Sequence, residues 1–330
     1  MIKNHLRRRS GAALVAVGAL VALTACSTAT AEAEAEGAYP LTIENCGADL
    51  EIASEPASVL TIGTSAIALL DTAGASDRIT ARSGEFGADL PEGLDNPPTD
   101  ATIVDPSDPT AESIIGAEPD IIVGYGLFNA APEDIAAAGI PEIVIDGECS
   151  HDAALTEKTD FDAIFADVSR LATVFGTEAA ADANLEELRA ELDDLTAAAS
   201  TETERGTAAV VYYFSESSTL SARGGQGIAD DVLDRAGFDN VYGDEPSVYL
   251  EVNVETLLDA DPDTIVLAYG LYGESYEDAK AHLLSEPGVT DLEAVKADRI
   301  VGVLASDLSP DPGALRGLRA VLEGTGRLSQ

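Results

Sequence analysis

Apolar residues follow two patterns along the chain from residue 58 onward. Short, almost continuous apolar runs predict buried strands, and longer segments with apolar residues every three or four positions predict helices. In the first half, strands are expected at 58–63, 77–82, 119–126 and 140–146, and helices at 64–74, 109–117 and 131–139. The second half repeats this plan, with strands at 207–214, 262–270 and 299–304 and helices at 228–237, 252–260 and 313–324. Strands that alternate with helices predict an α/β fold with parallel sheets.

The segment between the halves, residues 160–199, has a helical pattern throughout. Four leucines share one helix face of its second part: Leu185, Leu188, Leu192 and Leu195. Thr177 is a suitable N-cap, and neither Gly nor Pro interrupts the chain from there to residue 199. A helix over 177–199 would be roughly 33 Å long. One short stretch is too little for a coiled-coil seam, so we interpret it as a rigid connection between two α/β lobes.

One segment of the first half returns in the second. Residues 111–127, AESIIGAEPDIIVGYGL, correspond to residues 254–271, VETLLDADPDTIVLAYGL, which carry one extra residue before Tyr-Gly-Leu. The identical positions are Glu112, Pro119, Asp120 and Val123 in the first copy and Glu255, Pro262, Asp263 and Val266 in the second. Each lobe is therefore expected to contain the same unit: a Glu near a helix start, a Pro-Asp turn and a buried strand that ends in Tyr-Gly.

The first 38 residues differ from the rest of the chain. Lys3 and three arginines precede the apolar run GAALVAVGALVAL, the pattern of a secretory signal peptide over residues 1–25. This run is too short to span a bilayer comfortably. The sequence LTAC that follows is similar to a bacterial lipobox, which would make Cys26 the lipidated first residue; a secretion signal with a chance cysteine is the alternative. Residues 26–38 have the composition of a flexible tether.

The cysteine count is consistent with this interpretation. Three cysteines in a secreted chain leave one without a partner, and lipidation would use Cys26. Cys46 and Cys149 can then form a disulfide in an oxidising compartment. The bond would close a loop of roughly 100 residues. Two buried free thiols are the alternative.

The net charge limits the kind of partner. The formal charge is −42, and without the signal peptide 14 Lys and Arg face 60 Asp and Glu. A surface this acidic repels nucleic acids and anionic lipid headgroups, so no nucleic-acid partner is expected. A strongly anionic ligand would need several of the few arginines gathered at its site.

Taken in order, these features resemble the helical-backbone substrate-binding proteins of ABC importers for ferric siderophores, haem and cobalamin. The resemblance covers essentially the whole mature chain. It depends on the lipobox, the segments TIENCGADLEIASEPASVLTIG and TSAIALLDTAGASDRITAR at 42–82, the duplicated unit, and GIADDVLDRAGFDNVYG at 227–243. It implies two Rossmann-like α/β lobes, at 39–159 and 200–330, joined by a single long α-helix. The ligand would lie in the cleft between them, at the carboxyl ends of the strands.

The resemblance also implies a role for the duplicated glutamates. In the family, one Glu on each lobe pairs with arginines of the dimeric permease, and Glu112 and Glu255 match these positions. Two equivalent carboxylates suit a receptor with two-fold symmetry. The alternative is a Glu that the helix dipole favours in a first turn. The expected partners are thus an ABC permease dimer with its cytoplasmic ATPase and, through the lipid anchor, the outer face of the cell membrane; the chain itself is expected to be a monomer.

Loops that follow the predicted strands supply the candidate ligand contacts. The aromatic candidates are Tyr125, Phe128, Tyr213, Phe214, Tyr269 and Tyr272, and the polar candidates are Thr64, Ser65, Arg82 and Arg223. Aromatic faces pack on flat or apolar ligand surfaces, and tyrosine hydroxyls and arginines bond the oxygens of a chelate. Alternation along a strand would send either Tyr213 or Phe214 into the core instead. The arginines could also form structural ion pairs in this acidic chain.

The remaining chemistry points to a receptor. The mature chain has only His151 and His282, and its cysteines lack metal-binding spacing, so neither a direct metal site nor a cofactor is expected. An extracytoplasmic hydrolase would need a nucleophile with a base, and no G-x-S-x-G motif is present. We predict a receptor for an iron(III)–siderophore complex, hydroxamate-like rather than a trianionic catecholate because the surface is acidic. A cobalamin or haem receptor of the same family is the alternative.

Overall fold

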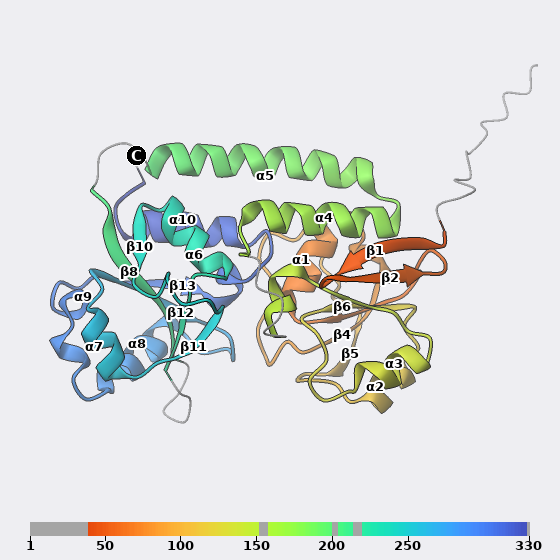
Figure 1. Ribbon diagram of the computed structural model, residues 1–330, viewed down its shortest axis with the longest axis horizontal. Coiled ribbons are helices and arrows are strands. Elements are labelled where there is room, and N and C mark those ends of the chain that lie inside the picture. Colours follow the sequence, from red (N-terminus) through yellow and green to blue (C-terminus); the bar gives the residue numbers. More distant parts are fainter. Residues whose placement is uncertain (1–38, 152–157, 200–203, 214–219, 329–330) are drawn as a thin grey trace, which may run out of the picture. The chain divides into compact units, whose positions relative to one another are not determined.

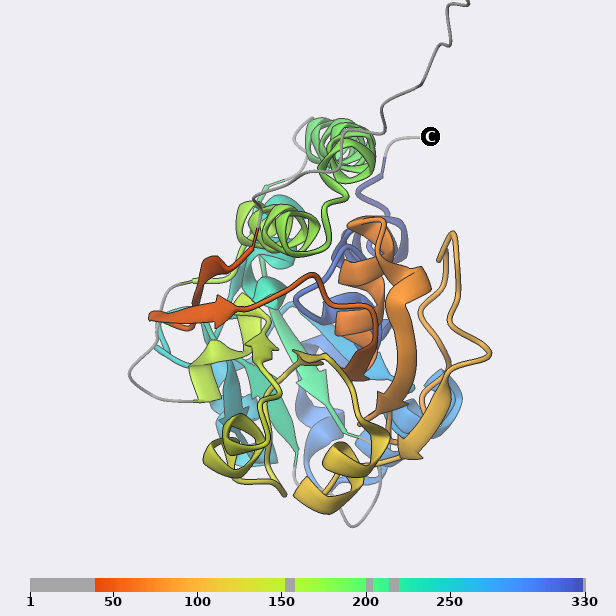
Figure 2. The ribbon, with the colours of Figure 1, turned by 90° about the vertical axis from the view of Figure 1, so that its right-hand side faces the viewer.

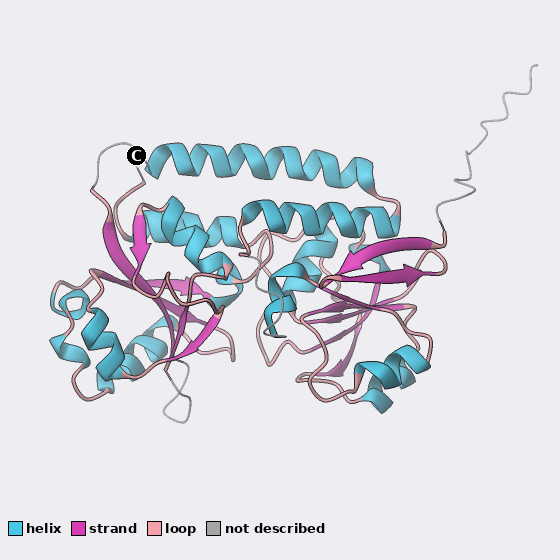
Figure 3. Cartoon of the chain, in the orientation of Figure 1, coloured by secondary structure: helices cyan, strands magenta, loops and turns pink. Residues whose placement is uncertain are grey.

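The computed structural model describes residues 39–151, 158–199, 204–213 and 220–328. The expected signal peptide, Cys26 and the tether lie outside the described residues, as does Phe214. Residues 39–330 form one unit with two large sheets, drawn in magenta in Figure 3. Among the helices of the described residues, none is long and apolar enough to cross a bilayer.

The first lobe is built on a five-stranded parallel sheet (Figure 1). Its strands are β3 (Val59–Ile62), β4 (Ile79–Ser83), β5 (Thr102–Asp105), β6 (Ile121–Gly124) and β7 (Glu142–Val144), in the order β5-β4-β3-β6-β7. Its helices are α1 (Thr64–Thr72), α2 (Ala111–Ala117), α3 (Pro132–Ala137) and the 3-10 helices η1 (Ser76–Arg78) and η2 (Asp146–His151). An antiparallel hairpin of β1 (Leu41–Asn45) and β2 (Ala48–Ile52) precedes the sheet. The parallel α/β arrangement predicted for this half is confirmed.

The second lobe has a six-stranded sheet that is only partly parallel. Its strands are β8 (Gly206–Tyr212), β9 (Ser221–Arg223), β10 (Phe238–Asn240), β11 (Tyr249–Glu251), β12 (Thr264–Tyr269) and β13 (Ile300–Leu304). β10 and β12 pair parallel with β8, and β13 pairs parallel with β12. β9, however, pairs antiparallel with both β8 and β11. The three strands predicted in this half, which correspond to β8, β12 and β13, thus pair parallel as expected. β9 and β11 were not predicted, and β9 pairs antiparallel with β8 because it returns after a short connection.

Helices and 3-10 turns surround the second sheet. They are α6 (Ile228–Arg235), α7 (Val254–Ala260), α8 (Tyr276–Ser285), η3 (Val289–Asp291), α9 (Glu293–Lys296), η4 (Ala305–Leu308) and α10 (Ala314–Gly324). α8 was not predicted, because its apolar positions are few: only Ala279 and Leu283 of this helix are buried.

Two consecutive helices connect the lobes. α4 (Phe161–Phe175) ends at Gly176, whose φ of 65° is the left-handed conformation that favours glycine at a helix end. α5 then runs over 22 residues, from Glu178 to Ala199, along the segment predicted as a rigid helix. Of its four aligned leucines, Leu188 is partly buried. The other three are buried: Leu185, Leu192 and Leu195.

α5 is attached to both lobes. The Asn184 side-chain amide donates to the Thr72 carbonyl at the end of α1, at 2.9 Å. Further along α5, Glu191 pairs with Arg319 of α10 at 2.7 Å. Figures 1 and 2 show α5 lying across both lobes on one side of the 39–330 unit. The lobes also share a hydrophobic cluster that includes residues of both sheets, α4, α5, α6 and α10, so they meet through a common core and not only through the connecting helix.

The duplicated segment folds in the same way twice, as α2 followed by β6 and as α7 followed by β12. Thr110 caps the N-terminus of α2 by accepting from the Ser113 N–H, and Asn253 caps α7 by accepting from the Thr256 N–H. Both helices end at a residue in the left-handed conformation, Glu118 in one copy and Asp261 in the other. The repeat in sequence is thus a repeat in local structure.

Candidate ligand-binding cleft

A cavity of about 290 Å³ lies between the two lobes of the 39–330 unit. The first lobe contributes residues that follow β3, β4, β6 and β7, and the second contributes residues at the ends of β8, β12 and β13. The cavity therefore lies at the carboxyl ends of the strands of both sheets, where α/β folds bind their ligands. Two helices also begin at its wall, α1 after Gly63 and α6 after Gly227, and neither has a side-chain cap. Their first N–H groups can bond ligand oxygens.

Six of the sixteen aromatic residues of the chain line this cavity: Phe86, Tyr125, Phe128, Tyr212, Tyr249 and Tyr272. In the first lobe the rings of Tyr125 and Phe128 lie 5.6 Å apart. Phe86 of the first lobe and Tyr272 of the second meet edge to face, with ring centroids 6.1 Å apart. The aromatic wall is thus continuous from one lobe to the other and offers faces for flat or apolar ligand surfaces.

Arg223 stands between two of these rings. Its guanidinium carbon lies 3.6 Å from the ring centroid of Tyr212 and 4.4 Å from that of Tyr249. Cation–π contacts of this kind hold a guanidinium in place without using its N–H donors. Among the described residues no carboxylate lies within ion-pair distance of Arg223. The Tyr212 hydroxyl is a hydrogen-bond partner of Arg223, and no described carboxylate competes with a ligand for the other donors of this side chain.

The loop after Arg223 keeps the side chain at the wall. Asn240 donates its side-chain N–H to the Arg223 carbonyl at 3.1 Å and to Asp230 at 3.0 Å. A side chain at Gly225 would place its Cβ 2.0 Å from the Gly243 carbonyl oxygen, so only glycine fits there. The glycines of SARGGQG thus serve the close packing of this loop on residues 243–248.

Glu148 brings a carboxylate to the same place from the first lobe. It lies in η2, lines the cavity and is only 9% exposed. The Tyr249 hydroxyl donates to both of its oxygens, at 3.0 and 3.2 Å. Enclosure, followed by the charge of Glu148, raises the pKa of Tyr249 well above its ordinary value. One tyrosine therefore binds a cation by its ring and an anion by its hydroxyl.

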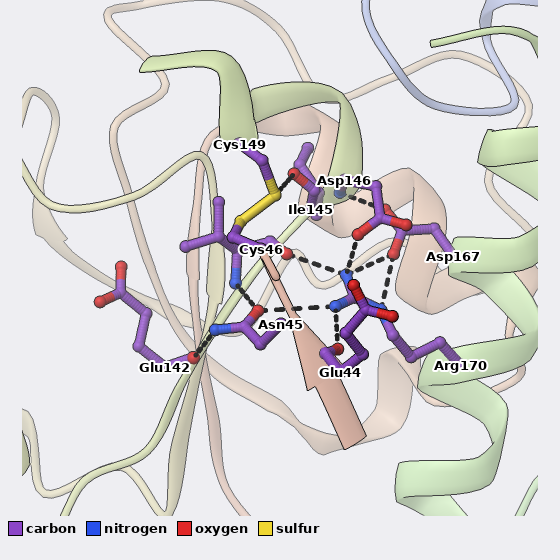
Figure 4. The surroundings of a disulfide bond; sticks show 10 residues. Glu44, Asn45, Cys46, Glu142, Ile145, Asp146, Cys149, Asp167 and Arg170 are labelled. Atoms are coloured by element: carbon purple, nitrogen blue, oxygen red, sulfur yellow. Dashed lines mark hydrogen bonds and ion pairs between the residues drawn. A yellow bond between two sulfur atoms is a disulfide. The ribbon is translucent and has the colours of Figure 1, made fainter. Parts of the chain in front are cut away.

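The turn that carries Glu148 is fixed on both sides (Figure 4). Before it, Arg170 donates to the Val144 carbonyl at 2.8 Å and pairs with the buried Asp167, which accepts from the Asp146 N–H at 2.8 Å. After it, the structure joins Cys149 to Cys46 of the β1–β2 hairpin, with Cα atoms 5.4 Å apart. The predicted pairing is thus compatible with the fold, and oxidation of the two thiols in the mature protein remains a prediction.

The structure places most of the predicted ligand contacts on the cavity wall. These are Thr64, Ser65, Tyr125, Phe128, Arg223 and Tyr272. The Tyr125 hydroxyl donates to Asp108 at 2.5 Å, and enclosure together with this bond raises its pKa strongly. The tyrosine is therefore a neutral group that a ligand meets by its ring. That these residues bind a ligand remains a prediction.

Three predicted contacts are corrected, because they do not line the cavity. Tyr213 is 3% exposed in the core of the second lobe, and its hydroxyl donates to Glu286 at 2.5 Å. Alternation along β8 turns Tyr212, not Tyr213, to the cavity. Tyr269 packs on Tyr276 instead, with ring centroids 5.8 Å apart.

Arg82 is the third correction. It is 7% exposed and donates from one Nη to both oxygens of Glu85, at 2.9 and 3.0 Å. Glu85, not Arg82, forms the cavity wall. Burial raises the pKa of Glu85, and the neighbouring Arg82 charge opposes that rise. The arginine thus neutralises a wall carboxylate from behind.

Sequence reasoning missed half of the wall aromatics, Phe86, Tyr212 and Tyr249, and both wall carboxylates. Phe86 and Glu85 follow β4 directly, so the rule that selected Arg82 could have found them. Glu148 follows the predicted strand at 140–146 by two residues, so the same rule could have found it as well. Tyr249 gave no such signal, because it follows no predicted strand and its position depends on the antiparallel β9–β11 pair.

The duplicated glutamates lie away from the cavity wall. Glu112 and Glu255 are exposed residues in the first turns of α2 and α7. Figures 1 and 2 show both helices on the side of the 39–330 unit opposite to α5. Within the described part of the chain, neither carboxylate forms an ion pair. Both are thus available to an external partner on one side of the unit.

The described residues contain no group of three or more His, Cys, Asp or Glu side chains that could hold a metal ion. The cavity of these residues offers instead aromatic faces, tyrosine hydroxyls, helix N–H groups, one guanidinium and two carboxylates. Apolar faces with a few polar groups among them are typical of a site for a small molecule.

Comparison with known proteins agrees with this geometry. The family model described as periplasmic binding protein matches residues 59–305 of the chain. Among curated proteins, none matches. A solved structure described as an ABC-type Fe3+-hydroxamate transport system, from Saccharomonospora viridis, is 25% identical with a TM-score of 0.75 and covers 87% of this chain and 99% of its own.

Two further solved structures share the fold. A periplasmic binding protein from Veillonella parvula is 19% identical with a TM-score of 0.72, over 86% of this chain and 96% of its own. A periplasmic haem-binding protein from Pseudomonas aeruginosa is 21% identical with a TM-score of 0.64, over 83% of this chain and 93% of its own.

Proposed function

Because the chain belongs to the periplasmic binding protein family, we propose that it is the solute receptor of an ABC importer for an iron(III) complex of a hydroxamate-type siderophore. Members of this family bind a solute outside the cytoplasm and do not catalyse a reaction. The identity of the solute is the part that we infer from the cleft.

The observation that carries the proposal is the position of Arg223. Its guanidinium is held between the rings of Tyr212 and Tyr249 on the cavity wall, with its donors unused by any described carboxylate. A ferric hydroxamate presents oxygen atoms around the metal and an apolar backbone outside them. The guanidinium and the helix N–H groups suit the oxygens, and the aromatic wall suits the backbone. The likeness to the Fe3+-hydroxamate protein of Saccharomonospora viridis supports the same ligand class.

Delivery of the ligand would use the side of the protein that is opposite to α5. We propose that Glu112 and Glu255 bind arginines of a permease dimer, because the two carboxylates are exposed at equivalent positions of two similar lobes. A lipid on Cys26 would hold the receptor at the outer face of the membrane, near that permease.

Isothermal titration calorimetry of the mature protein tests the ligand. The panel contains a ferric trihydroxamate, a ferric tricatecholate, ferric citrate, haem and cobalamin. We expect the trihydroxamate to bind most tightly. If only haem or cobalamin binds, that molecule and not a siderophore is the ligand. If no member of the panel binds, the proposal is wrong.

A matched pair of variants tests the site. R223Q should weaken trihydroxamate binding at least about tenfold, since it removes charge-assisted hydrogen bonds. R189Q removes an exposed arginine of α5 that does not line the cavity, and it should bind as the wild type does.

A further inference from the structure

We propose that Phe86 and Tyr272 form a gate at the mouth of the cleft, which has to open before a chelate can enter. This inference rests on the proposed siderophore function and adds the contact that limits ligand entry. Phe86 follows β4 in the first lobe, and Tyr272 follows β12 in the second.

The two rings of the gate meet where the cavity opens to solvent. Both line the cavity, and both reach the surface: Phe86 is half-buried and Tyr272 is 56% exposed. Their centroids lie 6.1 Å apart at an interplanar angle of 86°, the edge-to-face geometry that aromatic rings prefer. The backbones approach each other at the same place, since a Cβ on Gly273 would lie 3.6 Å from the carbonyl oxygen of Gly87. The two lobes therefore touch across the mouth of the cleft.

Each ring stands on a turn that is fixed in its own lobe. In the first lobe, the Phe86 N–H donates to the Pro106 carbonyl at 2.6 Å. In the second lobe, the Glu274 carboxylate accepts from the N–H groups of Gly270 and Tyr272, at 2.6 and 2.9 Å. Neither turn can swing aside without losing these bonds, so the rings separate most easily when the lobes themselves move apart.

The cavity behind the gate is small for the proposed ligand. Its volume is about 290 Å³, whereas sites for small molecules usually measure about 300–1,000 Å³. A ferric trihydroxamate carries three hydroxamate groups on one backbone and needs a site well inside that range. The arrangement in which Phe86 touches Tyr272 therefore has to widen before the cleft can hold such a chelate.

The cleft can widen more easily at the gate than at the core that joins the lobes. Both sheets, α4, α5, α6 and α10 share one hydrophobic cluster, and separation there would expose buried apolar surface. Among the described residues, Phe86 and Tyr272 lie outside this cluster. Their separation costs one aromatic pair, which changes the equilibrium between the closed and open arrangements by roughly two- to twelvefold. A gate with this cost slows entry without preventing it.

A gate and an ordinary wall residue act on different rate constants. Only the open arrangement admits a ligand, so the observed association rate constant is proportional to the open fraction. Loss of the contact between the rings raises that fraction and therefore speeds association. Loss of an ordinary wall contact would leave association unchanged and raise the dissociation rate constant instead.

Stopped-flow fluorescence measures both rate constants, because a bound ferric chelate quenches the tyrosines of the mature protein. The probe is ferrichrome, a ferric trihydroxamate. F86L removes the ring and keeps an apolar side chain, and we expect it to raise the association rate constant about two- to twelvefold. F86Y keeps the ring and should associate as the wild type does. Y272L changes a more exposed side chain and should have the same effect as F86L.

The double variant F86L and Y272L tests whether the two rings act as one contact. It should associate about as fast as either single variant, because each of them already removes the whole contact. L284A is the control, because Leu284 is an exposed apolar residue of α8 outside the cavity; both rate constants should stay unchanged.

Three results would overturn the gate. An unchanged association rate in F86L, while the wild type binds ferrichrome, would make Phe86 an ordinary wall residue and leave the proposed function standing. Effects of F86L and Y272L that multiply in the double variant would mean that the rings act separately, and the proposed function would again stand. If the wild type binds no ferric trihydroxamate, the proposed function fails and the gate fails with it.

Discussion

Asp120 and Asp263 make the same contact in the two lobes. Asp120, just before β6, accepts from the N–H groups of Ala57 and Ser58, both at 2.9 Å, where the neighbouring strand β3 begins. Asp263, just before β12, accepts from the N–H of Thr207 at 3.0 Å, at the start of the neighbouring strand β8. The Pro-Asp turn recurs in the sequence because each central pair of strands is tied together at its amino end by this carboxylate.

These two carboxylates should stabilise the fold in a pH-dependent manner. Backbone hydrogen bonds are the main cause that lowers the pKa of each aspartate. A folded-state pKa below the unfolded value means that the stabilisation is present above pH about 4 and is lost as the pH falls through the lower, folded value. D120N or D263N should therefore reduce the free energy of unfolding by about 1 kcal/mol at neutral pH and by less in acid.

Urea unfolding at neutral and acid pH measures this difference. D259N is the matched control, because Asp259 is an exposed residue of α7 whose side chain forms no hydrogen bond with the described residues. Equal destabilisation by D120N at both pH values would mean that the carboxylate charge does not contribute.

Asp311 should act on stability in the opposite direction. It is 2% exposed between η4 and α10 and accepts from the Gly313 N–H at 2.7 Å. Burial raises its pKa to about 7, although a hydrogen bond from Ser65, the Gly313 N–H and the Arg316 charge oppose the rise. The folded state then holds the proton more tightly than the unfolded state, so stability falls as the pH rises from about 4 to about 7.

D311N should remove this loss. We expect the melting temperature of D311N relative to the wild type to be higher at about pH 8 than at about pH 5, because the amide never ionises. D182N, which changes an exposed aspartate of α5, should show the same difference at both pH values. If the difference in melting temperature between D311N and the wild type is the same at both pH values, the pKa of Asp311 in the folded protein lies near its ordinary value.

Local patterns were enough to predict most of the fold, but only part of the cleft. β3 and the α5 leucine face follow from the spacing of apolar residues, which is a property of neighbouring positions. Arg223 could be selected because arginine is scarce in this chain. Whether Tyr212 or Tyr213 faces the cavity could not be predicted, because neighbouring residues of a strand point to opposite faces and a shift of one residue in the register exchanges them. Glu148 and Tyr249 meet only after the lobes have packed together, and no local pattern reports that.

The Cys46–Cys149 pair should be oxidised in the mature protein and should stabilise it. The residues are 103 positions apart, and closure of so long a loop stabilises by up to about 4.7 kcal/mol in the chain-entropy model. The C46S and C149S double variant should therefore melt at a clearly lower temperature. A reducing agent should lower the melting temperature of the wild type but not that of the double variant.

Thiol labelling of the denatured mature protein provides the direct check. With Cys26 lipidated, we expect no reactive thiol before reduction and two after it. Two reactive thiols before reduction would establish the alternative, in which both cysteines are free.

The matched carboxylates on α2 and α7 should be needed for transport but not for ligand binding. Glu112 and Glu255 are exposed and lie outside the cavity wall, so the double variant E112A and E255A should keep the wild-type affinity for the chelate. Uptake of the iron-55 chelate by cells that carry this variant should fall to background, since both charges that orient the receptor on a symmetric permease are gone. Each single variant should show an intermediate rate.

The double variant E133A and E277A removes two other exposed glutamates from helix first turns, one in each lobe, and should transport normally. Wild-type uptake by E112A and E255A would show that the permease recognises another surface, whereas an equal loss in both double variants would mean that overall charge, and not these two positions, governs docking.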